Sequence, residues 1–439
     1  MRVDGVRPHG EVRRMESNHL FEVALGLQSP WHVVEVSFAP APRVGERGLL
    51  RLRLDFGRGS RFPCVECAAP CPVHDTRVYE WRHRDFFEHE ARLEARVPRT
   101  RCEVHGVRNV QVHWGRPGSG FTLLFEALVL PLAKEMPVAA AARLLGEHDT
   151  RLWRLVTFHV KDARKRVDMK EVRALVVDET SQAKGHEYVS IFVEPGEKEA
   201  RVLYATQGRD HSVFTRFRQD VEEHGGDVGK IRDVCMDMSA AFRKGAAETM
   251  PKAHVTYDPF HVTKLAGEGV DEVRRREQAR EGGAALKGTR YTWLKNPENL
   301  TGDQYARLLR LSDLNLDTIT AYHMRLNLRE VWRSGSMKAA RRVLGKWTGW
   351  VMRASGPGKD GMPSPLDPMR SVAKTIREHM RGILNYYRRR LTSGVIEGFN
   401  SIVQAARARA RGYRNPETFK TMIYLIGGRL QFNLPIPTH

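Results

Sequence analysis

Residues 172–261 alternate between short apolar runs and amphipathic stretches, and this order constrains the fold more than any other part of the chain. Each apolar run has the length of a buried strand. The runs predict five strands, at residues 172–178, 187–194, 200–206, 231–237 and 254–258. Amphipathic patterns predict helices at residues 212–224 and 239–248 and from Pro259 onward. The β-β-β-α-β-α-β-α order therefore predicts a mixed α/β sheet.

This order suits a ribonuclease-H-like fold, in which three antiparallel strands are followed by parallel strands joined by helices. Periodicity alone indicates only a mixed sheet. Asp178 ends the first predicted strand, and Asp237 ends the fourth. In mixed α/β sheets, functional side chains gather beyond the carboxyl ends of parallel strands. If the first and fourth strands are neighbours, both carboxylates face one site.

Carboxylate oxygens at such a site suit Mg²⁺, which takes one or two carboxylates plus the oxygens of a phosphate substrate. Two such ions can stabilise the attacking and leaving oxygens of a displacement at phosphorus. The alternative is structural, because an Asp between a strand and a helix is often an N-cap.

Glu397 is the candidate for a third acid. It is flanked by arginines on both sides, namely Arg388, Arg389 and Arg390 before it and Arg407, Arg409, Arg411 and Arg414 after it. Spacing alone does not distinguish a metal-binding carboxylate from a surface ion pair in such a setting.

The whole chain has 72 Lys and Arg against 52 Asp and Glu, a formal net charge of +20. A folded protein this basic usually meets a polyanion. Nucleic acid is the first candidate, because Lys and Arg neutralise phosphates and release counterions. The sequence lacks an apolar run that could span a membrane and an apolar secretion signal. Five cysteines are too few for a disulfide framework. We therefore expect a cytoplasmic, nucleoid-associated protein.

Two pairs of residues have the spacing of zinc knuckles, Cys64-x2-Cys67 and Cys102-x2-His105. Together they give a Cys3His set, which is typical of a closed, structural zinc site. A Cys71-x2-His74 pair could replace one of the two knuckles. The alternative is a loop of reduced thiols without metal.

Residues 137–145 and 151–161 predict two helices, and Asp149 or Thr150 would cap the second. Two helices joined by a short Gly-containing turn are typical of a helix-turn-helix. The second helix would enter the major groove with its early residues, Thr150, Arg151 and Arg154. The alternative is an ordinary helical hairpin in a core.

A second set of arginines follows Glu397. Residues 405–414 read AARARARGYR, which predicts that Arg407 and Arg411 lie four residues apart on one helical face, with Arg414 near them. Such a stripe is usually solvated, but beside a nuclease centre it would follow DNA phosphates.

Several stretches of the chain resemble the DDE transposases of the ISL3 group of bacterial insertion sequences. The matching stretches are VDETSQAKGHEY (177–188), VCMDMSAAFRKG (234–245), VTYDPFH (255–261), WLKNPEN (293–299) and SGVIEGFN (393–400), the last continuing to RGYRNP (411–416). The resemblance extends over about residues 25–430.

The resemblance implies that Asp178, Asp237 and Glu397 form an Asp-Asp-Glu metal triad. It also favours a zinc module with paired knuckles at Cys64, Cys67, Cys102 and His105. Asp258 and His261 match an Asp-x-x-His motif of the family, which would help to position metal or phosphate. Asp258 before Pro259 is also a near-ideal helix start. Trp293 could stack on an unpaired base or anchor the core of a helical insertion.

The predicted organisation has six parts. They are an N-terminal β-containing segment (1–60), a zinc-binding module (61–120), a helix-turn-helix DNA-binding region (121–168), the first part of a ribonuclease-H-like core (169–265), a helical insertion (266–380) and C-terminal catalytic helices that carry the last acid (381–439).

The function that the resemblance implies is transposition. The protein would bind the terminal inverted repeats of a mobile element, cleave DNA with Mg²⁺ or Mn²⁺ and join the freed strand to target DNA. It would act as a homodimer or a larger assembly, with structural Zn²⁺. Two alternatives are a catalytically inactive DNA-binding regulator and a structure-specific nuclease on the same fold.

Overall fold

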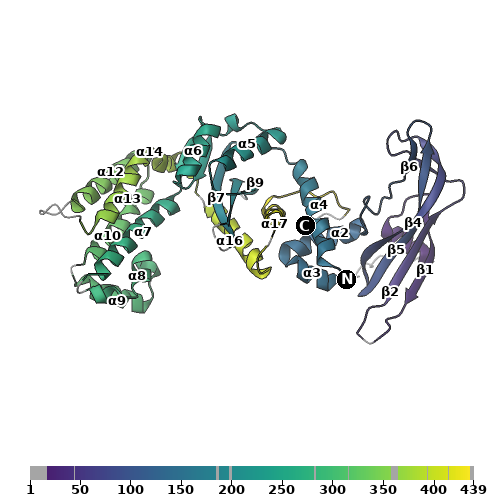
Figure 1. The fold of residues 1–439 in the computed structure, drawn as a ribbon, viewed down its shortest axis with the longest axis horizontal. Coiled ribbons are helices and arrows are strands. Elements are labelled where there is room, and N and C mark those ends of the chain that lie inside the picture. The colour runs from purple at the N-terminus through teal and green to yellow at the C-terminus, as the bar shows by residue number, and fades with distance from the viewer. Residues whose placement is uncertain are drawn as a thin grey trace, which may run out of the picture. The chain divides into compact units, whose positions relative to one another are not determined.

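The structure of the chain is a computed structural model, which describes residues 17–43, 45–183, 187–196, 200–280, 283–314, 316–356, 364–392, 394–413 and 415–435. The chain divides into two compact units (Figure 1). Unit 1 comprises Met1–Phe158 with Phe432–His439, and unit 2 comprises His159–Gln431. Within the described ranges, every helix is too short or too polar to cross a membrane.

Unit 1 is built on a six-stranded sheet of order β1-β2-β5-β4-β3, with β6 paired to β5. Its strands are β1 (Trp31–Ala39), β2 (Leu49–Phe56), β3 (Arg61–Pro63), β4 (Pro70–Phe86), β5 (His89–Cys102) and β6 (Gly106–Asn109). Neighbouring strands are antiparallel except β2 and β5, which are parallel. The sheet runs across the predicted division at residue 60.

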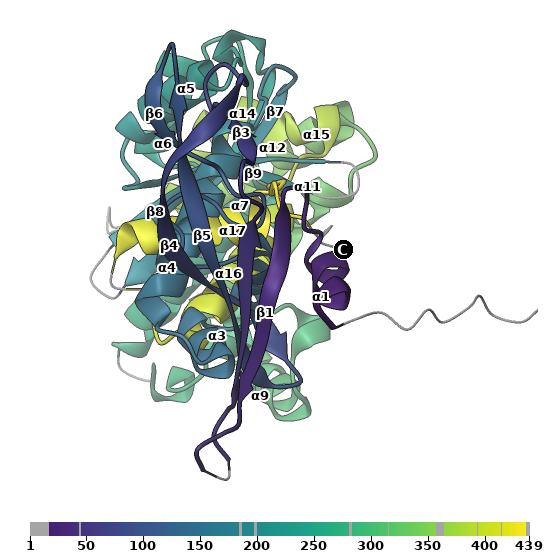
Figure 2. The ribbon, with the colours of Figure 1, turned by 90° about the vertical axis from the view of Figure 1, so that its right-hand side faces the viewer.

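The long strands β4 and β5 form one hairpin (Figure 2), which joins the rest of the sheet through the pairing of β5 with β2. The chain turns at Phe87 and Glu88, whose φ angles are 46° and 67°. Two positive φ angles in a two-residue loop match the right-handed twist of the strands they join. An aromatic core packs on the sheet, with Trp31 in edge-to-face contact with Phe56 and Trp114.

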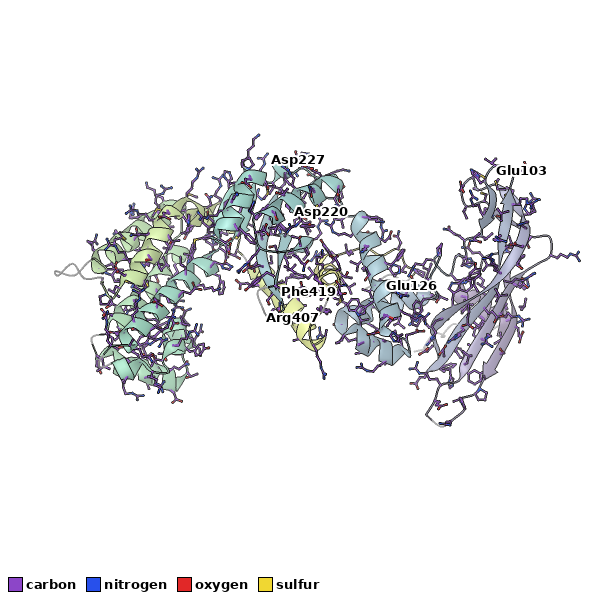
Figure 3. All side chains as sticks on the ribbon, in the orientation of Figure 1. Glu103, Glu126, Asp220, Asp227, Arg407 and Phe419 are labelled. Atoms are coloured by element: carbon purple, nitrogen blue, oxygen red, sulfur yellow. The ribbon has the colours of Figure 1, made fainter. Side chains whose placement is uncertain are left out.

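Helices complete unit 1, namely α1 (Ser17–Leu25), α2 (Leu123–Glu135), α3 (Val138–Leu145) and the first part of α4 (Asp149–Lys165). Glu126 of α2, labelled in Figure 3, is fully buried. Its carboxylate accepts hydrogen bonds from Arg116 Nε (2.9 Å) and Ser119 Oγ (2.5 Å). These bonds tie the loop before α2 to the helix, and they compensate the burial of the carboxylate.

Unit 2 contains a five-stranded sheet of order β11-β10-β7-β8-β9. Its strands are β7 (Ala174–Ala183), β8 (Glu187–Glu194), β9 (Arg201–Gln207), β10 (Asp233–Met236) and β11 (His254–Tyr257). The first three strands are antiparallel, and β10 lies parallel to both β7 and β11. The predicted mixed sheet and its strand order are therefore confirmed. The largest difference in boundaries is at β7, which continues beyond Asp178 to Ala183, whereas the other strand ends differ by at most two residues.

Helices cover both faces of this sheet. Successive residues of β7 point to opposite faces. Val177 packs in the core with α5, α6 and α7, whereas Val176 packs in the core with α16 and α17. This division follows from the two-residue period of a strand. The five helices are α5 (Ser212–Glu223), α6 (Ala240–Thr249), α7 (Pro259–Gln278), α16 (Gly394–Arg409) and α17 (Pro416–Gly427).

The chain between α7 and α16 is helical, as predicted. It comprises α8 (Arg290–Leu294), α9 (Gly302–Ser312), α10 (Asp317–Leu328), α11 (Glu330–Arg333), α12 (Met337–Ala354), α13 (Asp367–Glu378), α14 (Met380–Leu384) and α15 (Tyr386–Arg389), with short 3-10 turns at Gly283–Leu286 and Pro297–Asn299. Another 3-10 turn lies before β10, at Val228–Lys230. Trp293 of α8 has 0% exposure and donates its indole N–H to Thr289 Oγ1 (2.9 Å). It anchors the core, and its ring is not presented to a DNA base.

Candidate active site

Asp178 lies in the middle of β7, on the face of the sheet that α16 covers. Its side chain is only 14% exposed, and its Oδ2 accepts a hydrogen bond from Asn400 Nδ2 of α16 (2.8 Å). Burial raises the pKa of the Asp178 carboxyl from 3.8 to about 6, and the charge of Asp237 adds to the rise. Because β7 continues past Asp178, this residue is not a helix N-cap.

Asp237 follows the last residue of β10. The register pairs Cys235 of β10 with Val176 of β7, so Asp237 and Asp178 stand at the same level of two neighbouring parallel strands. Asp237 Oδ1 accepts a hydrogen bond from Ser239 N (3.0 Å), but Ser239 is the residue that caps α6. The predicted neighbourhood of the first and fourth strands is thus confirmed.

Glu397 is exposed in the first turn of α16. Helix α16 lies along β7, because Gln404 Nε2 donates to Thr180 Oγ1 (2.7 Å) and to the Ser181 carbonyl (2.8 Å). Positions 397, 400 and 404 share one helical face. Glu397 therefore lies on the same face as Asn400, three residues or about 4.5 Å of helix rise before it.

Two residues of α7 complete this region. Asp258 caps the helix, and its Oδ2 accepts hydrogen bonds from Phe260 N (2.9 Å) and His261 N (3.3 Å), which confirms the structural role of the Asp-Pro pair. His261 Nε2 lies 3.9 Å from Asp178 Oδ1. The structure therefore brings the His261 ring within ion-pair distance of Asp178, while the Asp258 carboxylate caps α7.

Glu179 follows Asp178 and pairs at 3.8 Å with Arg209, whose guanidinium covers the ring of Tyr188 (4.5 Å). Burial raises the pKa of Glu179, and the charge of Asp237 adds to the rise. Cys235 is fully buried, with its thiol toward the Leu391 carbonyl (3.7 Å), as expected of a core thiol. Burial raises the pKa of this thiol above the usual range of cysteine.

The residues around Asp178 fit a divalent cation. Asp178 and Asp237 offer hard carboxylate oxygens, and a cation would offset the burial and like-charge repulsion that oppose their joint ionisation. Asn400 Oδ1 is buried without a hydrogen-bond partner among the described residues, so it is a further oxygen available there. Sequence reasoning assigned no role to Asn400 or Gln404, although Asn400 ends the SGVIEGFN stretch.

Four residues of unit 1 form a compact cluster that could hold a metal ion. The ligand atoms of Cys64, Cys67, Cys102 and His105 all lie within 4.8 Å of one another. Cys67 Sγ is 3.7 Å from Cys102 Sγ, and Cys102 Sγ is 3.6 Å from His105 Nδ1. Zinc–sulfur bonds of about 2.3 Å in a tetrahedron would put ligand atoms roughly 3.8 Å apart. The structure thus brings together the predicted Cys3His set.

The backbone of this cluster favours thiolates, the form that binds metal. Backbone N–H groups of His105 and Val104 lower the pKa of the Cys102 thiol to about 7. The alternative knuckle does not enter the cluster. The Cys71 thiol points to the Ala69 carbonyl (3.3 Å), and His74 contacts Arg101 (3.4 Å).

Helices α3 and α4 are joined by a tight turn. Gly146 ends α3 with a φ of 67°, which glycine adopts without strain. Helix α4 begins at Asp149, and His148 Nδ1 accepts a hydrogen bond from Thr150 N (3.4 Å). The cap is therefore His148, and the predicted cap at Asp149 or Thr150 is wrong by one or two residues. The predicted pair of helices is confirmed.

The side chains at the start of α4 have different surroundings. Thr150 and Arg154 are exposed. Arg151 pairs with Glu147, and its guanidinium lies over the ring of Phe121 (4.4 Å). The structure thus leaves the Arg154 side chain open to a partner, whereas Thr150 Oγ1 lies 2.9 Å from His148 Nδ1 and Arg151 is engaged within unit 1.

The arginines near the end of α16 do not form the predicted stripe. Helix α16 ends at Arg409, and Arg411 has a φ of 57° in the turn that follows. Gly412 N closes this turn on the Arg407 carbonyl (2.8 Å). The prediction that Arg407 and Arg411 share a helical face is therefore wrong, and Arg414 lies outside the described residues.

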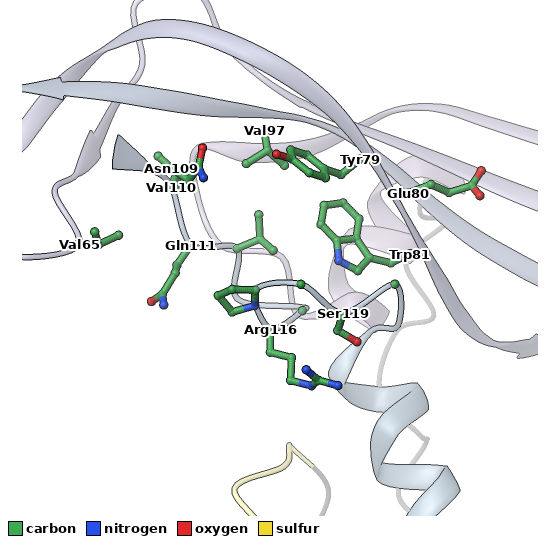
Figure 4. Close-up of a pocket in the computed structure, with 15 residues that line it drawn as sticks. Val65, Tyr79, Glu80, Trp81, Val97, Asn109, Val110, Gln111, Arg116 and Ser119 are labelled. Atoms are coloured by element: carbon green, nitrogen blue, oxygen red, sulfur yellow. The ribbon is translucent and has the colours of Figure 1, made fainter. Parts of the chain in front are cut away.

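An apolar pocket of about 580 Å³ lies in unit 1, beside the loop that precedes α2 (Figure 4). Tyr79, Trp81 and Val97 line one side of it. Gly115 lets the loop approach the Trp81 ring, since a Cβ at this position would come within 2.9 Å of Trp81 Nε1. None of the residues of the carboxylate site or of the Cys/His cluster is among the residues that line it.

Two helices joined by a tight turn and a mixed α/β unit with paired, partly buried carboxylates are a combination typical of DNA-processing proteins. Comparison with known families identifies this chain further. Residues 110–160 match the helix-turn-helix domain of transposase family ISL3, and residues 175–423 match the transposase domain of the same family. The second match covers more than half of the chain, so the chain belongs to the ISL3 transposases, as the motifs predicted.

Two curated relatives extend over most of the chain. The transposase for insertion sequence element IS1001 of Bordetella parapertussis is 28% identical over 81% of this chain and 86% of its own length. The transposase for insertion sequence element IS1557 of Mycobacterium tuberculosis is 26% identical over 94% of this chain and 97% of its own length.

Proposed function

We propose that this transposase binds the terminal inverted repeats of its insertion sequence and catalyses both DNA cleavage and strand transfer with Asp178, Asp237 and Glu397. The observation that supports this most strongly is the pairing of Asp178 and Asp237 at one level of neighbouring parallel strands. Helix α16, which carries Glu397, is fastened to Asp178 through Asn400. The strand order supports a ribonuclease-H-like catalytic core.

The three acids would hold two divalent cations, Mg²⁺ or Mn²⁺. Bound there, the cations would supply a nucleophilic water at neutral pH and stabilise both oxygens of an in-line displacement. Asn400 fixes one oxygen of Asp178, so the carboxylate is held in one orientation. Asp237 is oriented in the same way by the backbone of Ser239.

With the acids in these roles, water attacks the phosphodiester at the element end and frees a 3′-OH. That 3′-OH then attacks a phosphodiester of target DNA, which forms one phosphorus–oxygen bond as another breaks. The side chains of the site form no covalent bond to DNA in either step. Because two element ends must be held together, the active form is a homodimer or a larger assembly, acting on cytoplasmic DNA.

Other parts of the chain would support these steps. Cys64, Cys67, Cys102 and His105 would hold a structural Zn²⁺ that stiffens the sheet of unit 1. Thr150 and Arg154, which are exposed at the start of α4, would read the repeats. Arg407 and Arg411 would contact phosphates from the end of α16.

The test is cleavage and joining of a duplex that contains an element end, in the presence of Mg²⁺ and target DNA. Asp237→Asn should retain binding and lose cleavage by a factor on the order of 10³. Asp227→Asn is the matched control, because Asp227 only caps a short turn at Val228–Lys230, which Asn also caps. Cleavage by Asp237→Asn at the wild-type rate would refute the triad. Cleavage without any joined product would instead favour a nuclease.

A further inference from the structure

A basic pocket of about 640 Å³ lies at the amino-terminal edge of β10 and β11 in unit 2. Its charged lining comes from three distant parts of the chain, namely Arg232 and Asp233, Lys252 and His254, and Arg388 and Arg389. In the sequence, Arg388 and Arg389 are notable only as arginines that flank Glu397. The structure instead brings Arg388 and Arg389 to the edge of the sheet where β10 and β11 begin.

This pocket is separate from the acidic site. Asp233 and His254 are the first residues of β10 and β11 and are paired in register, whereas Asp237 follows the last residue of β10. Four residues of strand correspond to about 13 Å. The acids and the pocket therefore stand at opposite ends of the same short strand.

The lining carries a strong positive charge. Arg389 pairs with the largely buried Asp233 (2.9 Å), which is the one acid among the lining residues. Arg232, Lys252 and Arg388 are exposed, and within the described part of the chain they have no acidic partner. Three cations without an acidic partner thus line one cavity, where a bound anion would lower their mutual repulsion.

The backbone that presents these cations is well fixed. Arg232 N donates to the Arg173 carbonyl (2.8 Å), and His254 N donates to the Arg232 carbonyl (2.7 Å). These bonds extend the pairing of β10 with its neighbours by one residue. Arg388 and Arg389 end α15, and the Asn385 side chain at its start donates to the Val255 carbonyl of β11 (2.7 Å).

We propose that this pocket binds the sugar–phosphate backbone of DNA, at a contact separate from both the helix-turn-helix and the acidic site. The inference rests on the proposed function, since DNA is the substrate there. A volume of about 640 Å³ suits a nucleotide-sized segment of backbone rather than a lone phosphate. Unpaired Arg and Lys side chains without base-reading groups bind phosphates without regard to sequence.

One test uses the wild-type chain and lysine acetylation, with and without a duplex that lacks the terminal repeats. DNA should slow the acetylation of Lys252 at least threefold. Lys244 is the control, because it is similarly exposed but pairs with Glu248 on α6 (3.9 Å). Equal acetylation of Lys252 in free and DNA-bound protein would overturn the proposal.

A second test measures affinity for the same duplex as a function of salt. The triple variant Arg232→Gln, Lys252→Gln, Arg388→Gln should lower the slope of log Kobs against log salt by about 2 to 3, because each lost phosphate contact contributes roughly 0.9. The charge-matched control is Lys244→Gln, Arg276→Gln, Arg333→Gln, whose cations are already paired with acids. An equal slope in the two variants would refute the pocket.

These outcomes are independent of the catalytic proposal. Both tests measure binding alone, so they hold for Asp237→Asn as well as for the wild type. Full cleavage by Asp237→Asn would contradict the triad and leave the protection of Lys252 unaffected. Conversely, normal cleavage with an unprotected Lys252 would refute only the pocket. If the triple variant does not fold, the acetylation test still tests the proposed DNA contact, because it uses the wild-type chain.

Discussion

Asn400 Nδ2 donates a 2.8 Å hydrogen bond to Asp178 Oδ2, although 222 residues separate the two in the chain. The bond joins the helix that carries Glu397 to the strand that carries Asp178. We predict that Asn400→Leu, which keeps the side chain's size, lowers strand cleavage about tenfold. A hydrogen bond to a charged group contributes about 1.5 kcal/mol, and 1.36 kcal/mol corresponds to a factor of ten in rate.

Gln404→Leu is the matched control for Asn400→Leu. Gln404 lies one turn further along α16 and holds Thr180 and the Ser181 carbonyl instead of a carboxylate. Both variants should lose similar stability, measured by the thermal unfolding midpoint, but only Asn400→Leu should slow cleavage of an end-containing duplex. An equal loss of cleavage in both would mean that α16 acts only as a packing element.

The sequence predicted the sheet of unit 2 well, because its strands are buried on both faces and appear as continuous apolar runs. The hairpin of β4 and β5 was not predicted. Its strands carry exposed charged residues, such as Glu80, Arg84 and Arg96, so their apolar content is diluted. The alternation of Ala91, Leu93 and Ala95, all buried, was the available signal.

The candidate site was predictable in part for a similar reason. Asp178 and Asp237 stand out because each interrupts an apolar run, whereas Asn400 is a neutral amide in a helix, and only the tertiary contact reveals its role. The sequence did contain a signal against a helical position for Arg411. Gly412 closes the helix through its backbone, and a glycine after a helical pattern often marks its end.

The Cys/His cluster leads to a second prediction. Cys102→Ser should abolish zinc binding and destabilise unit 1 by several kcal/mol, because metal affinity contributes directly to folding. Cys71→Ser is the control, since Cys71 packs against Cys64 and Cys102 but is not one of the four ligand residues, and its thiol donates to the Ala69 carbonyl. Zinc content by atomic absorption and thermal unfolding would check both. Unchanged zinc in Cys102→Ser would contradict the assignment.

The start of α4 leads to a third prediction, which distinguishes a residue that recognises DNA bases from a residue that stabilises the fold. Arg154→Ala should weaken binding to the element's terminal repeats by about 1 to 3 kcal/mol if Arg154 contacts a base edge, without lowering stability. Arg151→Ala should lower stability as well, because Arg151 pairs with Glu147 and covers the Phe121 ring. Titration of repeat-containing and random duplexes, with thermal unfolding of each variant, would distinguish the two arginines. Equal binding of repeats by Arg154→Ala would exclude it as a reader.

The fourth prediction concerns His83, whose Nδ1 lies 2.9 Å from the hydroxyl of Thr122, the residue that caps α2. Burial lowers the pKa of His83 from 6.5 to about 4. Above pH 6.5 the ring is neutral in the folded and unfolded states, so it leaves stability unchanged. Between pH 6.5 and 4 only the unfolded state takes up the proton, and stability falls as the pH falls.

The expected loss from His83 is about 2 kcal/mol between pH 7.5 and pH 5, from a pKa difference of about 2.5 units. His83→Gln, which keeps a hydrogen-bonding group near Thr122 but does not titrate, should lack this component. Unfolding of both proteins at each pH gives a difference from which the other titrating groups, including the cluster cysteines, cancel. A constant difference between wild type and His83→Gln across this range would show that folding does not shift the pKa of His83, and would contradict the prediction.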